Sequence, residues 1–126
     1  MNGERQIFRR ENGAAVAFSE YGDPNGAPVF FCHGWPSSRT MAELTDESAK
    51  KLGLRIVSPD RPGIRDSKFQ PDRTLLDWPP LLLELATHLQ IDTFKILAIS
   101  GGAPYAYVAA WMIQERVEAI AVGGHA

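Results

Sequence analysis

Short apolar runs alternate with helix-like segments along this chain, and this alternation constrains its fold more than any other feature. The runs cover residues 28–32 (PVFFC), 54–58 (LRIVS) and 94–99 (FKILAI). Such runs are typical of strands that are buried on both faces of a sheet. Strands that alternate with helices form a parallel sheet with helices packed on its faces. We therefore expect an α/β fold.

The segments around these runs complete the pattern. Two further strands, over residues 5–9 and 14–19, are joined by the turn residues Asn12 and Gly13, and residues 21–28 are expected to form a loop. We expect a mostly parallel sheet of six strands with helices on both faces, in one domain over residues 1–126. The remaining expected elements are helices over residues 39–52, 79–90 and 101–114 and a last strand over residues 117–122.

Composition excludes several classes of function. The 13 basic and 15 acidic side chains give a net charge of −2, so no positive surplus is present to bind nucleic acid. A single cysteine, Cys32, rules out an internal disulfide and a thiolate-clustered metal site. No apolar stretch approaches the roughly 20 residues of a membrane span, and the first ten residues do not resemble a signal peptide. We therefore expect a cytoplasmic protein.

Small and polar residues follow each of the three buried runs. They are residues 32–36 (CHGWP), 58–67 (SPDRPGIRDS) and 98–102 (AISGG). In an open parallel sheet, binding and catalysis gather at the carboxyl ends of the strands. The sequence therefore predicts a functional site built from these three segments.

Ser100 lies at the junction between a predicted strand and a predicted helix. A serine on such a sharp turn projects its hydroxyl above the sheet and crowds the backbone, so the residues two before and two after it must be small. Ala98 and Gly102 meet this requirement. The start of the following helix directs N–H groups toward developing negative charge. The alternative role for this serine is that of a plain helix N-cap.

The segments HGWPSS, SPDRPGIRDS and AISGGAPYA, in this order and each after its expected strand, resemble the α/β-hydrolase fold family. The resemblance covers essentially the whole chain, from the first hairpin through what would be the family's sixth strand. It implies a serine hydrolase of the esterase, lipase or peptidase kind, with a small-molecule acyl substrate and no metal or organic cofactor. It also implies that the chain is the N-terminal half of a protein about twice as long, without the lid and the last strands.

The resemblance assigns roles residue by residue. Ser100 matches the nucleophile, and the backbone N–H groups of Gly101 and Trp35 match the oxyanion hole. Ala98 departs from the family's usual glycine, and its extra methyl group tightens the packing behind the turn. A serine at position 100 speaks against the family's dehalogenases and epoxide hydrolases, which use aspartate there.

A serine nucleophile needs a neighbouring base, and that base needs an orienting carboxylate. The resembled family places both after the nucleophile, where this chain offers only Glu115, Glu118 and His125. The two glutamates are expected at the opposite edge of the sheet, because the intervening helix carries the chain about 20 Å away. His125 returns to the edge of Ser100, either as an improvised base or as a histidine that lines the cleft.

Other polar and aromatic residues are open to more than one interpretation. His33 is either a base partner for Ser100 or a structural histidine that fixes the loop after its strand, and we favour the structural role. Asp60 is either a stand-in acid or a loop residue held by turn contacts. Tyr105, Tyr107 and Trp111 are expected to form core and cleft wall.

Two functions therefore remain open. The first is hydrolysis of an ester, thioester or amide through an acyl-enzyme on Ser100, with an incomplete set of catalytic partners in this chain. The second is a non-catalytic module of the same fold that binds a small apolar ligand or a partner chain. The exposed last strand also predicts possible self-association.

Overall fold

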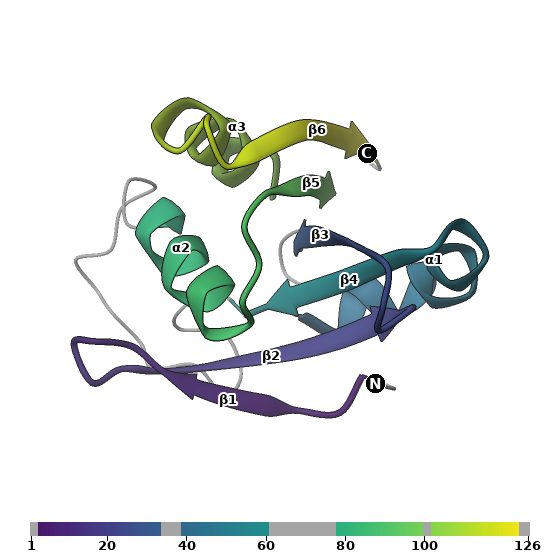
Figure 1. Cartoon of the computed structure of the whole chain (residues 1–126), viewed down its shortest axis with the longest axis horizontal. Helices are drawn as coiled ribbons and strands as arrows, with labels where there is room; N and C mark the ends of the chain where they lie inside the picture. Colours follow the sequence, from purple (N-terminus) through teal and green to yellow (C-terminus); the bar gives the residue numbers. More distant parts are fainter. Residues whose placement is uncertain (1–2, 34–38, 61–77, 100–101, 124–126) are drawn as a thin grey trace.

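A computed structural model describes residues 3–33, 39–60, 78–99 and 102–123 of the chain. Its strands form one sheet in the order β1-β2-β4-β3-β5-β6 (Figure 1). The strands are β1 (Gln6–Arg9), β2 (Ala15–Gly22), β3 (Ala27–Cys32), β4 (Leu54–Pro59), β5 (Phe94–Ile99) and β6 (Val117–Gly123). The helices are the 3₁₀ helix η1 (Arg39–Thr45), α1 (Asp46–Leu52), α2 (Trp78–His88) and α3 (Ala103–Met112).

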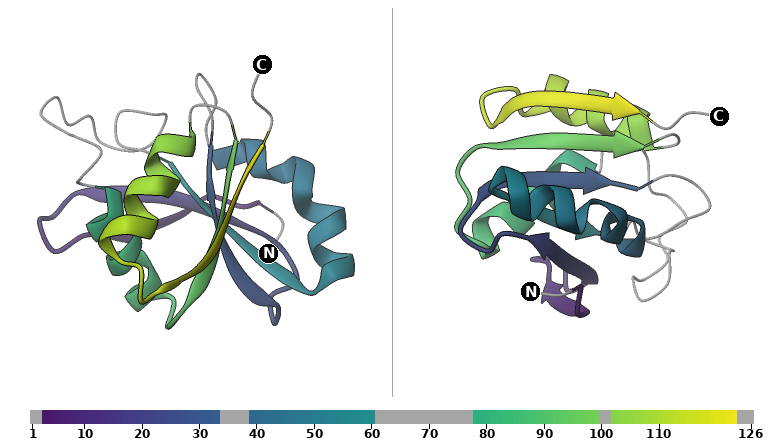
Figure 2. Two further views of the ribbon diagram at one scale, coloured as in Figure 1. Left: turned by 90° about the horizontal axis from the view of Figure 1, so that it is seen from above. Right: turned by 90° about the vertical axis from the view of Figure 1, so that its right-hand side faces the viewer.

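The sheet is mostly parallel, as predicted. The hairpin strand β2 pairs antiparallel with β1 and β4, whereas β4, β3, β5 and β6 run parallel to their neighbours. Helices α2 and α3 cover one face, and η1 and α1 lie on the other (Figure 2). The predicted fold class, with six strands and helices on both faces, is confirmed.

The end of the second strand differs from the prediction. Strand β2 continues through Gly22 because Glu20 and Tyr21 pair with β4 and are buried. The predicted loop over residues 21–28 is therefore too long, since β3 already begins at Ala27. A tight turn joins the two strands, in which the Gly26 N–H donates to the Asp23 carbonyl at 2.9 Å.

The first helical segment is divided, whereas one continuous helix was predicted. Its first part is the 3₁₀ helix η1, in which the Thr45 hydroxyl donates to the Ala42 carbonyl at 2.6 Å. Such a local side-chain bond competes with regular α-helical pairing. Helix α1 follows and ends at Gly53, whose φ of 67° is the left-handed conformation that glycine adopts readily.

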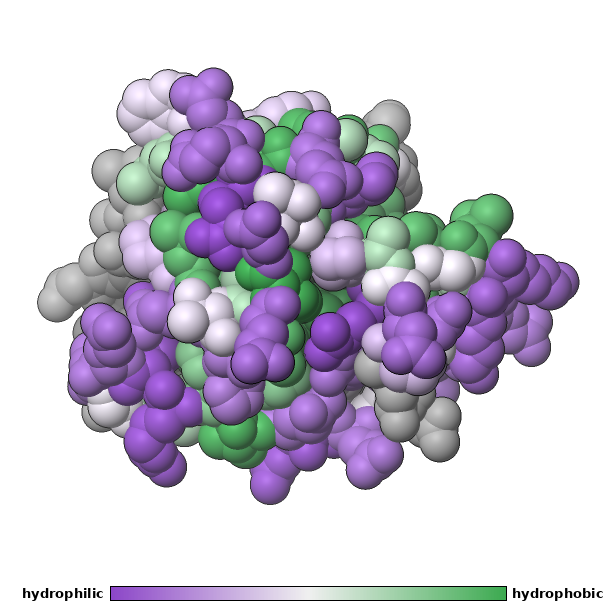
Figure 3. Space-filling view, viewed as in Figure 1, coloured by the Kyte–Doolittle hydropathy of each residue, from purple (hydrophilic) through white to green (hydrophobic). Residues whose placement is uncertain are grey.

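The core is divided between the two faces of the sheet. On one face, α2 and α3 pack on residues such as Phe30 and Phe94, whose ring centroids lie 4.5 Å apart. On the other face, Phe31 and Ile56 pack beneath η1 and α1. Hydrophilic side chains cover much of the surface, and apolar surface shows between them (Figure 3).

Asp46 joins β2 to α1. Its carboxylate accepts a hydrogen bond from the Gly22 N–H at 2.7 Å and pairs with Lys50 at 3.0 Å. These two contacts, the first being the larger cause, hold the pKa of Asp46 below its ordinary value. A lowered folded-state pKa means that the contribution to stability is present above the unfolded pKa of 3.8 and is lost as the pH falls through the folded value.

We therefore predict that Asp46→Asn lowers the free energy of unfolding by about 1 kcal/mol at neutral pH. The difference from the native chain should shrink as the pH falls below about 4, because protonation then removes the same charge from the native protein. Urea unfolding of both chains at pH 7 and pH 3 measures this. An equal difference at both pH values would contradict the assigned role of the charge.

Candidate active site

The carboxyl ends of three parallel strands lie side by side. In the register of the sheet, Cys32 of β3 is opposite Ala98 of β5, and β4 pairs with β3 on its other side. The segments that follow these strands therefore leave the sheet at one edge, as the sequence predicts. This edge is the candidate active site.

The turn from β5 to α3 is short. Strand β5 ends at Ile99 and Gly102 is the N-cap of α3, so two residues lie between the strand and the helix N-cap. Gly102 lies directly against the end of β3, where a Cβ atom would come within 2.2 Å of the Cys32 carbonyl oxygen and 2.9 Å of that of His33. This contact gives a physical reason for a glycine here and joins two of the predicted site segments.

Several predicted site residues lie outside the described residues. They are the candidate nucleophile, the two oxyanion-hole donors and the last histidine, and their roles stay predictions. For the candidate nucleophile and the donor that follows it, the structure describes the residues on either side, which are Ile99 at the end of β5 and Gly102, the N-cap of α3. The residues concerned are Ser100, Gly101, Trp35 and His125.

His33 and Asp60 are part of the protein interior at this edge. Both are fully buried, and they follow the neighbouring strands β3 and β4. The backbone N–H of Asp60 donates to the Ala17 carbonyl at 2.9 Å, which ties the end of β4 to β2. Complete burial fits the structural role that we favoured for His33. The stand-in role of Asp60 stays a prediction.

Glu118 lies far from the candidate site, as expected. Its carboxylate accepts hydrogen bonds from Thr93 at 2.6 Å and from Lys95 at 3.1 Å, at the start of β5. These two contacts, with the Thr93 bond the larger, hold the pKa of Glu118 below its ordinary value. The Glu118 carboxylate therefore lies at the amino-terminal ends of β5 and β6, opposite the end of the sheet where the candidate site lies.

The prediction for the aromatic residues of α3 is partly wrong. Tyr105 does pack on the core, with its ring 5.6 Å from that of Trp78. Tyr107 and Trp111 are instead 56% and 70% exposed. The reason is the helical period, because Ala106 and the other small residues on its face contact the sheet and turn these two aromatic residues outward.

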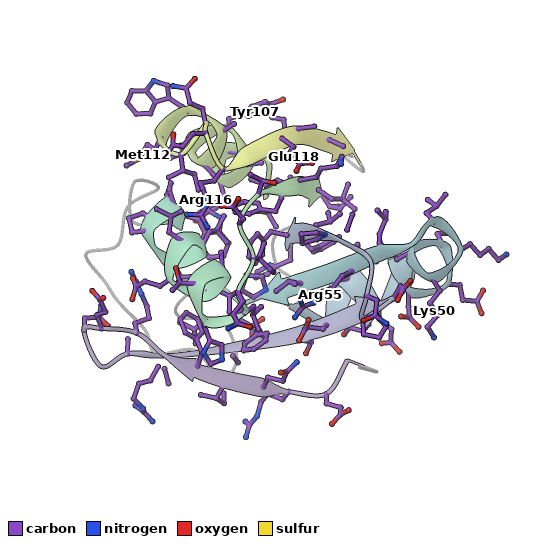
Figure 4. The ribbon with its side chains drawn as sticks, viewed as in Figure 1. Lys50, Arg55, Tyr107, Met112, Arg116 and Glu118 are labelled. Atoms are coloured by element: carbon purple, nitrogen blue, oxygen red, sulfur yellow. The ribbon has the colours of Figure 1, made fainter. Side chains whose placement is uncertain are left out.

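Sequence reasoning missed a buried ion pair between β2 and β4. The Arg55 Nε donates to Glu20 at 2.6 Å, and the Gln6 side chain donates to the other carboxylate oxygen at 3.0 Å. Arg55 lies near the start of β4, away from the candidate active site (Figure 4). No local sequence signal marks this pair, because Arg55 is 35 positions away from Glu20 in the sequence.

The described part of the chain contains neither a cluster of metal ligands nor a helix that could span a membrane. Within residues 3–33, 39–60, 78–99 and 102–123, no three histidine, cysteine, aspartate or glutamate side chains gather as ligands for a metal ion. In the same part of the chain, no helix has the length and apolar character needed to cross a membrane.

Two curated proteins are similar to this chain, whereas no family model matches it. The uncharacterized hydrolase YcgS of Bacillus subtilis (strain 168) is 28% identical over 109 residues, which cover 86% of this chain and 37% of that protein. An epoxide hydrolase of Caballeronia sordidicola is 29% identical over 114 residues, covering 86% of this chain and 33% of that protein. The match thus spans about a third of each relative's length.

Solved structures show the same architecture. A thermophilic esterase from Thermogutta terrifontis superposes with a TM-score of 0.80 at 25% identity, over 94% of this chain and 44% of the esterase. The architecture described above is therefore shared with a solved hydrolase structure. The resemblance inferred from the three motifs is confirmed: this chain has the α/β-hydrolase fold, and the curated relatives that it matches are hydrolases.

Proposed function

We propose that this chain carries the nucleophile of a serine hydrolase that acts on a carboxylic ester, thioester or amide. The observation that carries the proposal is the contact of Gly102 with the backbone of Cys32 and His33. It joins the turn that contains Ser100 to the segment that leads to Trp35. A nucleophile and oxyanion-hole donors must come from such adjoining segments.

In the proposed reaction, the Ser100 oxygen attacks the substrate carbonyl carbon and its proton passes to a base. The negative charge that develops on the carbonyl oxygen is held by the N–H groups of Gly101 and Trp35. The leaving group departs with a proton, which produces an acyl-serine, and water then releases the acid. The positive end of α3, which begins directly after this turn, favours the same charge.

The kind of substrate follows from the side chain at position 100. The relatives include an epoxide hydrolase and the structural neighbours include an esterase. A serine hydroxyl forms an ester with an acyl group, and this favours acyl transfer. Epoxide opening in this fold family relies on an aspartate at the corresponding position, which this chain lacks. We therefore place the chain with the ester-cleaving members.

The base and the orienting acid are the incomplete part of the proposed machinery. Among the described residues, Glu118 is bound at the opposite edge of the sheet. The match also covers only about a third of each curated relative. On this proposal, the 126 residues alone give no steady ester hydrolysis, and a test of the nucleophile must not depend on a base.

A cysteine at position 100 provides such a test, because a thiolate attacks acyl groups without a separate base once the pH exceeds its pKa. We predict that Ser100→Cys is acylated by a p-nitrophenyl ester at least about tenfold faster than an unassisted surface thiol. Mass spectrometry locates the acyl group and stopped-flow absorbance gives the rate. Ser48→Cys, on an exposed face of α1, is the matched control.

The native chain completes the comparison, since its single cysteine, Cys32, is buried. It should gain no acyl group on sulfur and should show no turnover of the ester. If the new thiol of Ser100→Cys reacts no faster than that of Ser48→Cys in folded protein, the proposed oxyanion hole is wrong. Steady hydrolysis by the native chain that disappears in Ser100→Ala would instead show that a base is already present.

A further inference from the structure

Two turns of this protein carry the same dipeptide, asparagine followed by glycine. They are Asn12–Gly13 between β1 and β2, and Asn25–Gly26 between β2 and β3. An alanine follows each pair, and in both turns the glycine N–H donates at 2.9 Å to the carbonyl of the residue three positions before it. A third pair begins at Asn2, which lies outside the described residues. The two described turns therefore form a matched comparison.

An asparagine before a glycine can lose its side-chain amide without an enzyme. The glycine nitrogen, once its proton has passed to hydroxide, attacks the asparagine Cγ, so that an N–Cγ bond forms and ammonia leaves. Water then opens the resulting succinimide ring at either carbonyl, which gives aspartate or isoaspartate. Glycine favours the attack because it has no Cβ atom to hinder it. The asparagine–glycine peptide must first rotate until the nitrogen faces Cγ, so a turn that resists local opening suppresses the reaction.

The turn at Asn12 resists this rotation weakly. Glu11, Asn12 and Gly13 are exposed, and the tip of the hairpin projects beyond the sheet (Figure 1). A Cβ atom built on Gly13 would meet nothing within 4 Å, so the peptide has space to rotate. Rotation breaks the bond from the Gly13 N–H to the Arg10 carbonyl and the bond from the Ala14 N–H to the Asn12 Oδ1, each 2.9 Å long. Both bonds lie at the hairpin tip, where water replaces the lost partners.

The turn at Asn25 is held against the segment that connects α1 to β4. Gly26 lies against the backbone of Gly53, where an added Cβ atom would collide with the carbonyl oxygen. The N–H groups of Asp23 and Ala27, on either side of the pair, donate at 2.9 Å to carbonyls of the same segment. Rotation of the peptide between Asn25 and Gly26 would therefore move backbone that is fixed on both sides. The same dipeptide should react slowly here.

We propose that Asn12 is a site of spontaneous modification, which is converted to isoaspartate and aspartate in the folded protein while Asn25 stays intact. The change would reach α2, because Glu84 accepts hydrogen bonds from the Arg10 Nε at 2.9 Å and from the Glu11 N–H at 3.0 Å. Isoaspartate adds one carbon atom to the backbone next to this contact and brings a second carboxylate close to that of Glu84. Both changes weaken the contact between the hairpin and α2.

Incubation of the folded chain at body temperature and mildly alkaline pH tests the proposal. Cleavage after aromatic residues places Asn12 in the fragment 9–18 and Asn25 in the fragment 22–30. Mass spectrometry with electron-transfer fragmentation measures the mass gain of each fragment and distinguishes isoaspartate from aspartate. We expect Asn12 to be modified at least about fivefold faster than Asn25 in the folded chain, and the two at similar rates in guanidinium chloride.

Urea unfolding of aged and fresh protein measures the consequence. The aged native chain should unfold at a lower urea concentration than the fresh chain. Asn12→Ser cannot form the ring and keeps Asn2 and Asn25, so it should age without this loss. Fresh Asn12→Asp adds the charge without the extra backbone atom and separates the two causes.

Two results would overturn the proposal. The first is Asn25 modified as fast as Asn12 in the folded chain, which would mean that the contact with Gly53 does not hold its turn. The second is the same ratio of the two rates in folded and unfolded protein, which would mean that the fold does not select the site. A modified Asn12 with no loss of stability would overturn the effect on α2.

Discussion

Gly102→Val should lower the free energy of unfolding by about 4 kcal/mol or more, enough to unfold much of a small domain. The backbone at Gly102 has a φ of −79° and a ψ of −14°, which any residue adopts, so the cost is not conformational. It is steric, because a Cβ atom would lie 2.2 Å from the Cys32 carbonyl oxygen. Backbone cannot rotate away as a flexible side chain can. Relief requires α3 to move off β3.

Gly102→Ala is the milder form of the same test and should cost about 2–3 kcal/mol. Urea unfolding followed by circular dichroism gives the values. Gly123→Ala is the matched control, because a Cβ atom at Gly123 meets nothing within 4 Å. A Gly102→Ala chain as stable as Gly123→Ala would show that β3 and α3 do not approach each other as described.

Arg55→Met is the second change with a large expected effect. Glu20 is 6% exposed and would keep only the Gln6 side chain as a described partner. Removing one member of a buried ion pair leaves an uncompensated charge and costs about 3–5 kcal/mol. We therefore expect Arg55→Met to lower the free energy of unfolding by this amount at neutral pH.

A double variant separates the charge from the shape of the side chains. Glu20→Gln in the Arg55→Met background removes the isolated carboxylate and retains an oxygen that accepts from Gln6. We expect it to recover at least half of the lost stability, because a matched neutral pair costs less than one buried charge. Urea unfolding of both single variants and the double variant completes the cycle. Additive losses would show that Glu20 and Arg55 are not coupled.

The strands β3 and β5 could be predicted from the sequence, because β3 is a continuous apolar run and β5 is apolar except for Lys95. The extension of β2 could not. Glu20 carries a charge, and its burial depends on Arg55, which is remote in the sequence. A polar residue of this kind joins a strand only when a tertiary partner neutralises it.

The candidate active site could also be predicted from the sequence only in part. Crowding at a sharp strand-to-helix turn is a local requirement, so small residues at Ala98 and Gly102 could be recognised from spacing alone. The exposure of Tyr107 and Trp111 could not be foreseen, because α3 is apolar on every side and its sequence has no periodic contrast. The sheet beneath the helix decides which face is buried.

The parallel pairing of Cys32 with Ala98 has a consequence for how the site is assembled. These residues are 66 positions apart in the sequence, so their meeting requires closure of a long loop, which is entropically costly and slow. No local hairpin or helix can bring the candidate nucleophile and oxyanion segments together in advance. During synthesis, a ribosome must release β5 before the first of these contacts can form. The two segments of the candidate site therefore come together late in folding.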